Sequence, residues 1–395
     1  MYRPVAAGQT AHDEVDALEH SQAIPNEAHA TGVRRIPAAA RSIIVLWTAS
    51  RVAVVLLGWL MSTRLGWHRA LEPWQRQPWT ALTGWDSVYY IRIAHQGYAE
   101  GPRVAFFSLY PLLIRGTEAI TGLSDAVASL AVSNIAALIG MMGIYVLGRD
   151  RLSPQHAWRA VLYLVLSPYA FALVLAYSEG VFIALASWLF VFSDRRRHLP
   201  AAALGVLTGM TRVNGQALIA PLAVVAWRRR SPAAAAVAAA PAVGLGLHML
   251  WLWHSVGDPV AFVHAQGHWG GHASFPPLAL GEEFWQFAQT GRAIHLLSGL
   301  MVVAYLALLV PILRLPQFAR HRWEDTLYVA GIFALPLLAG VLQSSGRFGV
   351  LAFPLFFALA DLGLRRPGLH RAYVVFAPVF QILAFGYVAL GYLVP

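Results

Sequence analysis

The sequence predicts an all-α polytopic membrane protein, and this fold class rests on its apolar composition, the spacing of its apolar runs and the placement of its arginines. Of the 395 residues, 58% are apolar and 12% are charged, whereas soluble domains carry about 25% charged residues. The apolar residues form about eleven runs, and a helix needs about 20 such residues to cross a bilayer. Cysteine is absent, so disulfides and thiolate chemistry are excluded.

Arginines gather in short clusters between the apolar runs. These clusters contain Arg34, Arg35 and Arg41; Arg149, Arg151 and Arg159; Arg195, Arg196 and Arg197; Arg228, Arg229 and Arg230; Arg314, Arg320 and Arg322; and Arg365, Arg366 and Arg371. Loops with this composition face the cytoplasm in membrane proteins. The net charge of +10 could also suggest nucleic acid, but its confinement to loops between spans argues against a nucleic acid partner.

The first elements are a tail, a span and a long loop. Residues 1–33 are polar and poor in large apolar side chains, which predicts a disordered cytoplasmic tail. The first span, about 42–62, leaves the cytoplasm and leads into an outer loop of about 63–124. Two amphipathic stretches in this loop, 86–97 and 105–121, predict interfacial helices. If the second stretch were a span, every later loop would be inverted and the arginine clusters would lie outside.

The remaining spans alternate in direction, and the returning spans end at arginine clusters. They are expected at about 125–148, 157–175, 178–193, 199–211, 214–227, 232–254, 292–313, 325–342, 348–363 and 372–393. The pair 199–211 and 214–227 is short for a bilayer core of about 30 Å, so it need not cross fully. A second long outer loop covers about 255–291, and the C-terminus is expected outside.

Polar residues of an unusual kind collect on the predicted outer side. They are Asp86 beside Trp85 in the first long loop; Tyr177 and Glu179 in one turn; Arg212 and Asn214 in the next; Gln266, His268 and Trp269 in the second long loop; and Gln343 and Arg347 in a further turn. Uncharged turns would satisfy the topology. Charged residues at this surface therefore indicate a function.

These residue types suit an anionic lipid and a hydroxyl-bearing acceptor. Arg212 and Arg347 would hold a phosphate through charge-assisted hydrogen bonds, and Asp86 would accept a proton from the acceptor hydroxyl. Trp85 and Trp269 would stack on sugar rings or belong to the interfacial aromatic belt. Simpler interpretations remain open: Asp86 could cap a helix, both arginines could reach lipid headgroups, and Glu179 could be a surface residue.

Two further groups carry weaker signals. His254, His264, His268 and His272 could form a metal cluster, and the last three are spaced by four residues, as ligands on one helix face would be. The glycines among them oppose a helix, and no carboxylate lies among the last three, so neither a metal nor a cofactor is expected. Glu282 and Glu283 are expected on a solvated loop face.

Six segments occur together in the order seen in one known family. They are Trp85-Asp86-Ser87 through Ile93-Ala94 and Gly97-Tyr98; Ala105-Phe106-Phe107 with Tyr110-Pro111; Tyr177-Ser178-Glu179 with Phe182; Arg212 with Asn214-Gly215; Asp258-Pro259 with Ala261-Phe262, Gln266 and Trp269; and Arg347-Phe348 with Phe353-Pro354. With these segments the chain resembles the PIG-V family, the membrane mannosyltransferases that include glycosylphosphatidylinositol mannosyltransferase II and its bacterial homologues. Gly84 and Ser108 depart from the family pattern, which often has a basic residue and proline there.

The resemblance implies that residues 34–395 form one GT-C transmembrane catalytic domain, with its active site on the outer face of the cell inner (plasma) membrane. It implies inverting transfer of mannose, or a similar hexose, from a polyprenyl-phosphate sugar donor to a glycolipid or glycan hydroxyl acceptor, among the membrane lipids. Asp86 would be the general base. Two alternatives stay open: a transporter or flippase of a lipid-linked glycan, although no inverted repeat is evident, and a subunit that only binds a glycolipid.

Overall fold

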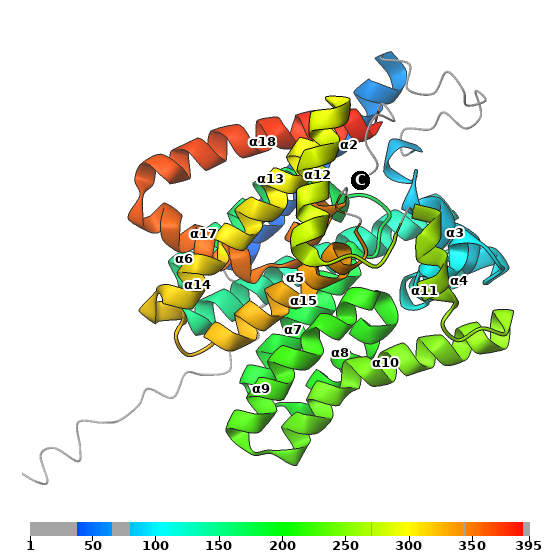
Figure 1. Ribbon diagram of the computed structural model, residues 1–395, viewed down its shortest axis with the longest axis horizontal. Helices are drawn as coiled ribbons and strands as arrows, with labels where there is room; N and C mark the ends of the chain where they lie inside the picture. Colours follow the sequence, from blue (N-terminus) through cyan, green and yellow to red (C-terminus); the bar gives the residue numbers. More distant parts are fainter. Residues whose placement is uncertain (1–37, 65–79, 270, 341, 343, 390–395) are drawn as a thin grey trace, which may run out of the picture. The chain divides into compact units, whose positions relative to one another are not determined.

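The computed structural model describes residues 38–64, 80–269, 271–340, 342 and 344–389 (Figure 1). The predicted tail, 1–33, lies outside the described residues. In the described ranges every regular element is a helix, and the residues from Ala39 onward form one compact unit. The predicted all-α class is confirmed.

The α-helices follow the order of the apolar runs. They are α2 (Ala38–Arg64), α3 (Asp86–Gln96), α4 (Leu109–Thr121), α5 (Asp125–Arg151), α6 (Pro154–Leu166), α7 (Glu179–Asp194), α8 (His198–Thr211), α9 (Ile219–Arg229), α10 (Pro232–Val256), α11 (Ala261–His264), α12 (Pro276–Thr290), α13 (Ala293–Ala307), α14 (Leu309–Arg314), α15 (Arg322–Leu338), α16 (Ser345–Leu351), α17 (Pro354–Arg365) and α18 (Pro367–Ala389). Short 3-10 helices include η2 (Thr80–Leu82), η3 (Pro102–Ala105), η4 (Ala170–Leu173), η5 (Val213–Leu218), η6 (Ala265–Trp269) and η7 (Pro316–Phe318).

Among the described residues, five helices have the length and apolar composition of a membrane span. They are Ala38–Leu60, Asp125–Arg151, Pro232–Val256, Ile294–Arg314 and Pro367–Ala389. The pair α16 and α17 counts as a sixth if it is one broken span. The other expected spans correspond to shorter helices, namely α6, α7, α8, α9 and α15. Both amphipathic stretches of the first loop form helices, α3 and α4.

The span expected at 157–175 breaks early. Helix α6 ends at Leu166, because Ser167 precedes Pro168 and takes an extended conformation with ψ 150°. The chain then continues through the buried 3-10 helix η4 as far as α7. Irregular backbone at membrane depth is tolerated only inside protein, where its polar groups find partners.

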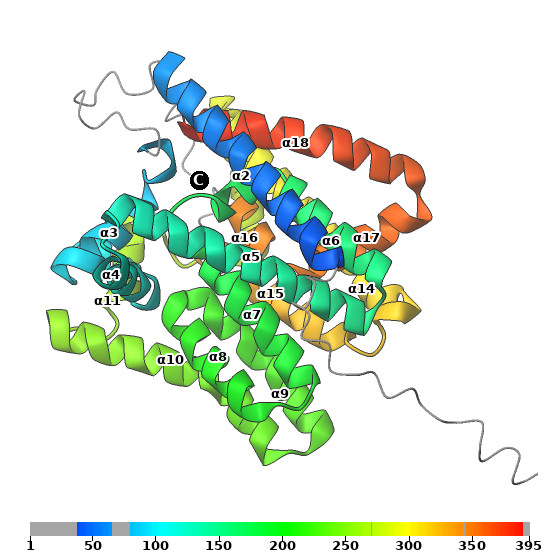
Figure 2. The ribbon, with the colours of Figure 1, turned by 180° about the vertical axis from the view of Figure 1, so that it is seen from behind.

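Side chains of two other helices provide those partners. Arg51 of α2 donates to the carbonyl of Leu173 at 3.1 Å, and Asn134 of α5 donates to the next carbonyl, of Val174, at 2.9 Å. Ser133 of α5 donates to the carbonyl of Leu175 at 2.8 Å. Figure 2 shows α2 lying across α5, which brings these donors together beside the irregular segment. The segment is thus held rigidly just before it reaches Tyr177.

The span expected at 348–363 is also interrupted. Helices α16 and α17 meet at an angle of 81°, with Pro354 at the first turn of α17. Proline lacks the N–H that would continue the preceding helix and is favoured where a new helix starts. The bend leaves α16 as a short buried helix that carries Arg347.

Glycines allow the central helices to approach closely. Helix α7 packs between α5 and α8 (Figure 1), and a side chain at Gly180 of α7 would collide with the carbonyl of Ser133 in α5. Helices α8 and α10 cross at Gly209 and Gly244, where each glycine faces the backbone of the other helix. Small residues at such crossings favour helix association in a membrane.

Ion pairs join the arginine-rich loops at one end of this bundle. Arg151 pairs with Asp194 at 2.8 Å and with Asp325 at 2.6 Å, and Arg228 pairs with Glu324 at 2.8 Å. These contacts connect the ends of α5, α7 and α9 with the start of α15. The prediction that these clusters share one end is therefore confirmed for the loops that contain these residues.

Candidate active site

The first long loop presents Asp86 at the start of a helix. Asp86 is the first residue of α3, and Trp85 before it adopts a left-handed φ of 55°. This conformation is costly for a bulky residue and is concentrated at functional sites. The segment that leads to Trp85 is held in place at Leu82, whose carbonyl accepts a 2.9 Å hydrogen bond from the backbone N–H of Ala176. No side-chain cap closes α3, so Asp86 is not the N-cap residue considered above.

The carboxylate of Asp86 instead contacts Arg347. The Nη1 atom of Arg347 lies 2.5 Å from Asp86 Oδ2. Its Nε atom lies 3.4 Å from Glu179 Oε1, and its Nη2 donates to Ser344 Oγ at 3.4 Å. The guanidinium also stands over the ring of Tyr177, 5.3 Å from the ring centroid, in a cation–π arrangement. Arg347 is thus held by four side chains from three parts of the chain.

Glu179 and Arg212 form the second half of the site. Glu179 is the first residue of α7, and its side chain is completely buried. Arg212 follows α8 and places Nη1 2.7 Å from Glu179 Oε1. The same Nη1 donates to Ser178 Oγ at 3.0 Å, and this hydroxyl lies 2.8 Å from the hydroxyl of Tyr90 in α3.

Asp86, Glu179, Arg212 and Arg347 together form what we call the charge quartet. It alternates two carboxylates and two guanidiniums, so its formal charge is zero. The exposed fractions of the side chains are 18% for Asp86, 0% for Glu179, 11% for Arg212 and 10% for Arg347. Removing charges from water is costly unless they are paired, and the alternating order supplies that pairing.

The charge quartet retains hydrogen-bonding capacity. Both oxygens of Glu179 and the Nε of Arg347 are buried near opposite charges but have no hydrogen bond of good geometry. Buried polar atoms are normally satisfied, and exceptions concentrate at functional sites. A polar ligand or water entering here would find donors and acceptors already in place.

Two tyrosines beside the charge quartet stay protonated at neutral pH. Burial raises the pKa of Tyr90 to about 12, and burial also holds the pKa of Tyr177 well above its usual value of 10.0. Both phenols can therefore donate hydrogen bonds but cannot serve as bases. Of the two carboxylates in the site, Asp86 is partly exposed, whereas Glu179 is completely buried. It is the group best placed to accept a proton.

The other predicted site residues lie in several places. Asn214 is buried in η5, and its Nδ2 has no hydrogen-bond partner. Gln266 and His268 are exposed on η6, where their side chains donate to the backbone carbonyls of Phe262 and Ala265. Trp85 is partly buried, with an unpartnered Nε1. Gln343 and the side chain of Trp269 lie outside the described part of the structure. For these residues, substrate binding stays a prediction.

Sequence reasoning included Ser178 and Tyr90 in the family segments but did not predict the contacts that their hydroxyl groups make, nor the contact of Ser344. Ser178 immediately precedes Glu179, and Tyr90 is four residues after Asp86 and therefore on the same helix face. These two spacings could have indicated them. Ser344 contacts the charge quartet only because α16 begins after it, and nothing in the sequence pattern indicated this.

One carboxylate of the predicted second long loop is buried instead of solvent-exposed. Glu283 was expected on a solvated loop face, which is wrong: it lies in α12, is 8% exposed and has its Oε2 2.7 Å from His295 Nδ1 in α13. Of the histidines considered as metal ligands, His264 lies 2.8 Å from Asp258 and His272 lies 3.7 Å from Glu282. In the described ranges no three metal-ligating side chains form a group suited to a metal ion.

Sequence comparison connects this site with a known family. The family profile described as Mannosyltransferase (PIG-V) matches residues 70–219, a segment that holds Asp86, Glu179 and Arg212. This segment is similar to the PIG-V mannosyltransferases. It is 31% identical over 144 residues to GPI alpha-1,6-mannosyltransferase 2 of Rattus norvegicus, with 34% of this chain and 29% of that protein covered. It is 29% identical over 188 residues to GPI mannosyltransferase 2 of Chaetomium globosum, with 37% and 39% covered. The match therefore spans about a third of these curated relatives.

Structural comparison concerns the fold. The chain resembles the crystal structure of ArnT from Cupriavidus metallidurans bound to undecaprenyl phosphate, with a TM-score of 0.51, 14% identity, and coverage of 89% of this chain and 77% of that chain. At this identity the likeness is one of fold alone. The predicted GT-C-type bundle is confirmed, and the chain is a multi-pass membrane protein. Helices α3 and α4 form as expected, and their interfacial position stays a prediction.

Proposed function

We propose that this protein is an inverting glycosyltransferase that moves mannose, or a similar hexose, from a polyprenyl-phosphate sugar to a hydroxyl of a lipid-linked or glycan acceptor. The observation that carries the proposal is the position of Arg347. This arginine lies outside the segment that matches the family, 70–219, yet it contacts two carboxylates inside that segment, Asp86 and Glu179. A proton acceptor and a phosphate-binding group therefore meet at one point.

In this reaction Asp86 removes the proton of the acceptor hydroxyl. The hydroxyl oxygen forms a bond to the anomeric carbon of the donor sugar, from the side opposite the phosphate. The bond between that carbon and the phosphate oxygen breaks, and the polyprenyl phosphate leaves with the electron pair. The proton ends on Asp86, and the configuration of the sugar is inverted. General base catalysis of this kind contributes about 10²–10⁴ in rate.

Arg347 and Arg212 are assigned to the donor phosphate. In the ligand-free charge quartet their charges are balanced by Asp86 and Glu179. A donor phosphate would compete with Asp86 for Arg347, and this exchange would leave Asp86 free to act as a base. Glu179, buried between the two guanidiniums, would keep them oriented. Guanidiniums fixed before the reaction stabilise the charge that develops on the leaving phosphate.

The donor class is supported by the comparisons and by the membrane environment. The ArnT structure contains undecaprenyl phosphate, and the mannose comes from the PIG-V relatives. We assign the site to the extracytoplasmic face of the cell inner (plasma) membrane, because α7 carries Glu179 at its start and Asp194, which pairs with Arg151, at its end. Sixteen residues of helix separate these points by about 24 Å, and arginine-rich loops face the cytoplasm.

Purified full-length protein tests the proposal directly. It would be incubated with radiolabelled polyprenyl-phosphate mannose and a glycolipid extract, and labelled glycolipid is the expected product. A mannose nucleotide replaces the lipid donor in the control and should give no product. Transfer from the nucleotide alone would contradict the donor assignment. Movement of label across a vesicle bilayer without a new glycosidic bond would support the transporter instead.

A further inference from the structure

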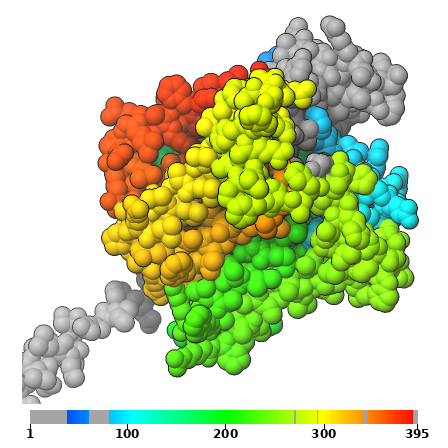
Figure 3. Space-filling view, in the orientation of Figure 1, coloured from blue at the N-terminus to red at the C-terminus, as the bar shows by residue number. Residues whose placement is uncertain are grey.

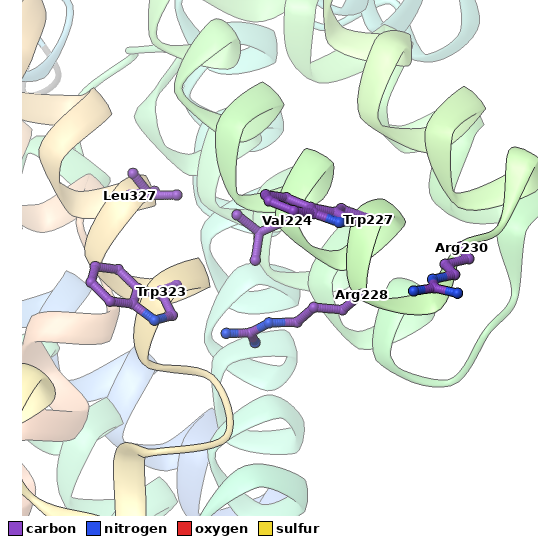
Figure 4. A pocket seen from close by; sticks show the side chains of 6 residues that line it. All are labelled: Val224, Trp227, Arg228, Arg230, Trp323 and Leu327. Carbon is purple, nitrogen blue, oxygen red and sulfur yellow. The ribbon is translucent and has the colours of Figure 1, made fainter.

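A recess lies at the arginine-rich end of the protein, between α9 and α15. Its volume is about 520 Å³, and its lining consists of Val224, Trp227, Arg228, Arg230, Trp323 and Leu327. Figure 4 shows Val224 and Trp227 on α9 facing Leu327 and Trp323 on α15 across the gap. Along the same face, the green atoms of α8–α10 border the yellow and orange atoms of α13–α15 (Figure 3).

This recess is separate from the charge quartet. Helix α9 begins just after η5, the segment that follows Arg212, and lines the recess from Val224, in its middle, onward. Helix α15 contributes Trp323 from its first turn and runs from there toward α16, which carries Arg347. From Leu327, the lining residue farthest along α15, eleven residues of helix remain, which span about 17 Å. A ligand in the recess would therefore not reach Arg347.

The walls of the recess have the character of a membrane interface. The side chains of Trp227 and Trp323 are 82% and 52% exposed, although tryptophan is among the largest apolar residues. Tryptophan is enriched where the hydrocarbon core meets the headgroups, because its ring is apolar and its N–H can donate. Val224 and Leu327 are the other apolar residues of the lining (Figure 4).

Positive charge surrounds the mouth of the recess. Arg228 pairs with buried Glu324 at 2.8 Å and donates to the carbonyl of Arg320 at 3.2 Å, so that pair is neutral. Arg230 is exposed at the turn after α9, where it adopts a left-handed φ of 46°. Arg320 is exposed as well. Glu324 neutralises only Arg228, so the rim of the recess keeps a net positive charge.

We propose that this recess binds the headgroup of an anionic phospholipid from the surrounding leaflet. The lipid phosphate would lie between Arg228 and Arg230, and the glycerol and first acyl carbons between Trp227 and Trp323. Basic recesses between membrane helices recognise anionic headgroups, whereas a zwitterionic headgroup brings no net charge to the rim. This site does not depend on the proposed transfer reaction.

Native mass spectrometry of the purified full-length protein tests the site. Palmitoyl-oleoyl phosphatidylglycerol and phosphatidylcholine share their acyl chains, so the ratio of their adducts reports headgroup selection. The wild type should retain phosphatidylglycerol preferentially. Arg230→Gln should weaken phosphatidylglycerol retention about fivefold, the effect of one basic residue near an anionic surface, and Trp227→Ala should weaken it further.

Arg366→Gln is the matched control, because Arg366 belongs to the arginine clusters, is exposed and lies outside the recess. It loses the same charge and should bind phosphatidylglycerol as the wild type does. Equal retention of both lipids by the wild type would overturn the proposal. So would an equal loss in Arg230→Gln and Arg366→Gln, which would assign the preference to overall charge. Both arginines are exposed, so their replacement should leave the fold intact.

Discussion

The pair of Glu179 and Arg212 provides the most stringent energetic test of the charge quartet. Arg212→Gln removes the guanidinium 2.7 Å from a carboxylate that is completely buried. Breaking a buried ion pair from one side usually costs about 3–5 kcal/mol, because the other charge stays buried without compensation. Arg347 remains 3.4 Å from Glu179 and offsets part of this loss. We therefore expect Arg212→Gln to lower the free energy of unfolding by about 3 kcal/mol.

A double-mutant cycle separates the pair from other effects of each substitution. Glu179→Gln in the Arg212→Gln background removes the orphaned charge, so the cycle should give a coupling of about 2 kcal/mol. Arg195 and Asp150 form the matched control: their atoms also lie 2.7 Å apart, but the side chains are 42% and 35% exposed. Exposed pairs contribute about 0.2–1 kcal/mol, so this second cycle should give a small coupling.

Equilibrium unfolding in mixed micelles of a mild detergent and dodecyl sulfate would measure both cycles. The prediction depends on burial rather than on distance, since the two distances are equal. If the two coupling energies agreed within about 0.5 kcal/mol, the precision with which independent effects add, burial would not strengthen the charge quartet and the reasoning would be refuted.

Three other outcomes follow from the structure. The chain has no cysteine, so a single introduced cysteine can report topology. A cysteine replacing the exposed Glu100 should react with an impermeant thiol reagent in intact cells, whereas one replacing the exposed Gly368 should not. The reverse labelling pattern would mean that the orientation is inverted. Gly180→Ala should destabilise the protein by about 1–3 kcal/mol in thermal unfolding, because the new methyl group would collide with the backbone of α5. Gly116 has open space around it, so Gly116→Ala should not destabilise the protein. Equal effects of the two substitutions would contradict the close contact at Gly180. Arg347→Ala should impair donor use strongly, by up to about 3 kcal/mol in the transition state. Arg347→Lys should restore only part of the lost donor use, because lysine lacks the planar fork of the guanidinium. Full rescue in donor kinetics would mean that a simple positive charge suffices.

Most of the helical plan could be predicted from the sequence, because apolar runs and arginine clusters act locally. The positions of the helices agree closely with the expected spans, but their lengths do not always agree. The span expected at 157–175 ends at Leu166, and its continuation is stabilised by Arg51 and Asn134. These donors lie far away in sequence, so hydropathy gives no sign of them. Local patterns place helices, while long-range hydrogen bonds decide where helices break.

The sequence was sufficient to predict which charged residues belong to the site, but not how they are arranged. Charged residues on the predicted outer side were recognisable, because topology does not require them there, and the charge quartet unites four of them. Their direct mutual neutralisation was not predicted, since it depends on long-range contacts such as that of Arg347 in α16 with Asp86 in α3. The burial of Glu283 could not be predicted from the sequence for the same reason. Its partner, His295, lies on the next helix, and no periodicity relates the two.

The turnover of Asp86→Asn tests the central claim most directly. The amide keeps the shape of the side chain but is not basic, so transfer from polyprenyl-phosphate mannose should fall about 10²–10⁴-fold while the protein stays folded. Asp125→Asn is the control, because Asp125 is also the first residue of a helix, α5, and is 46% exposed; it should keep wild-type turnover. If Asp86→Asn transferred mannose within about twofold of the wild type, Asp86 would not be the base and the proposed mechanism would be wrong.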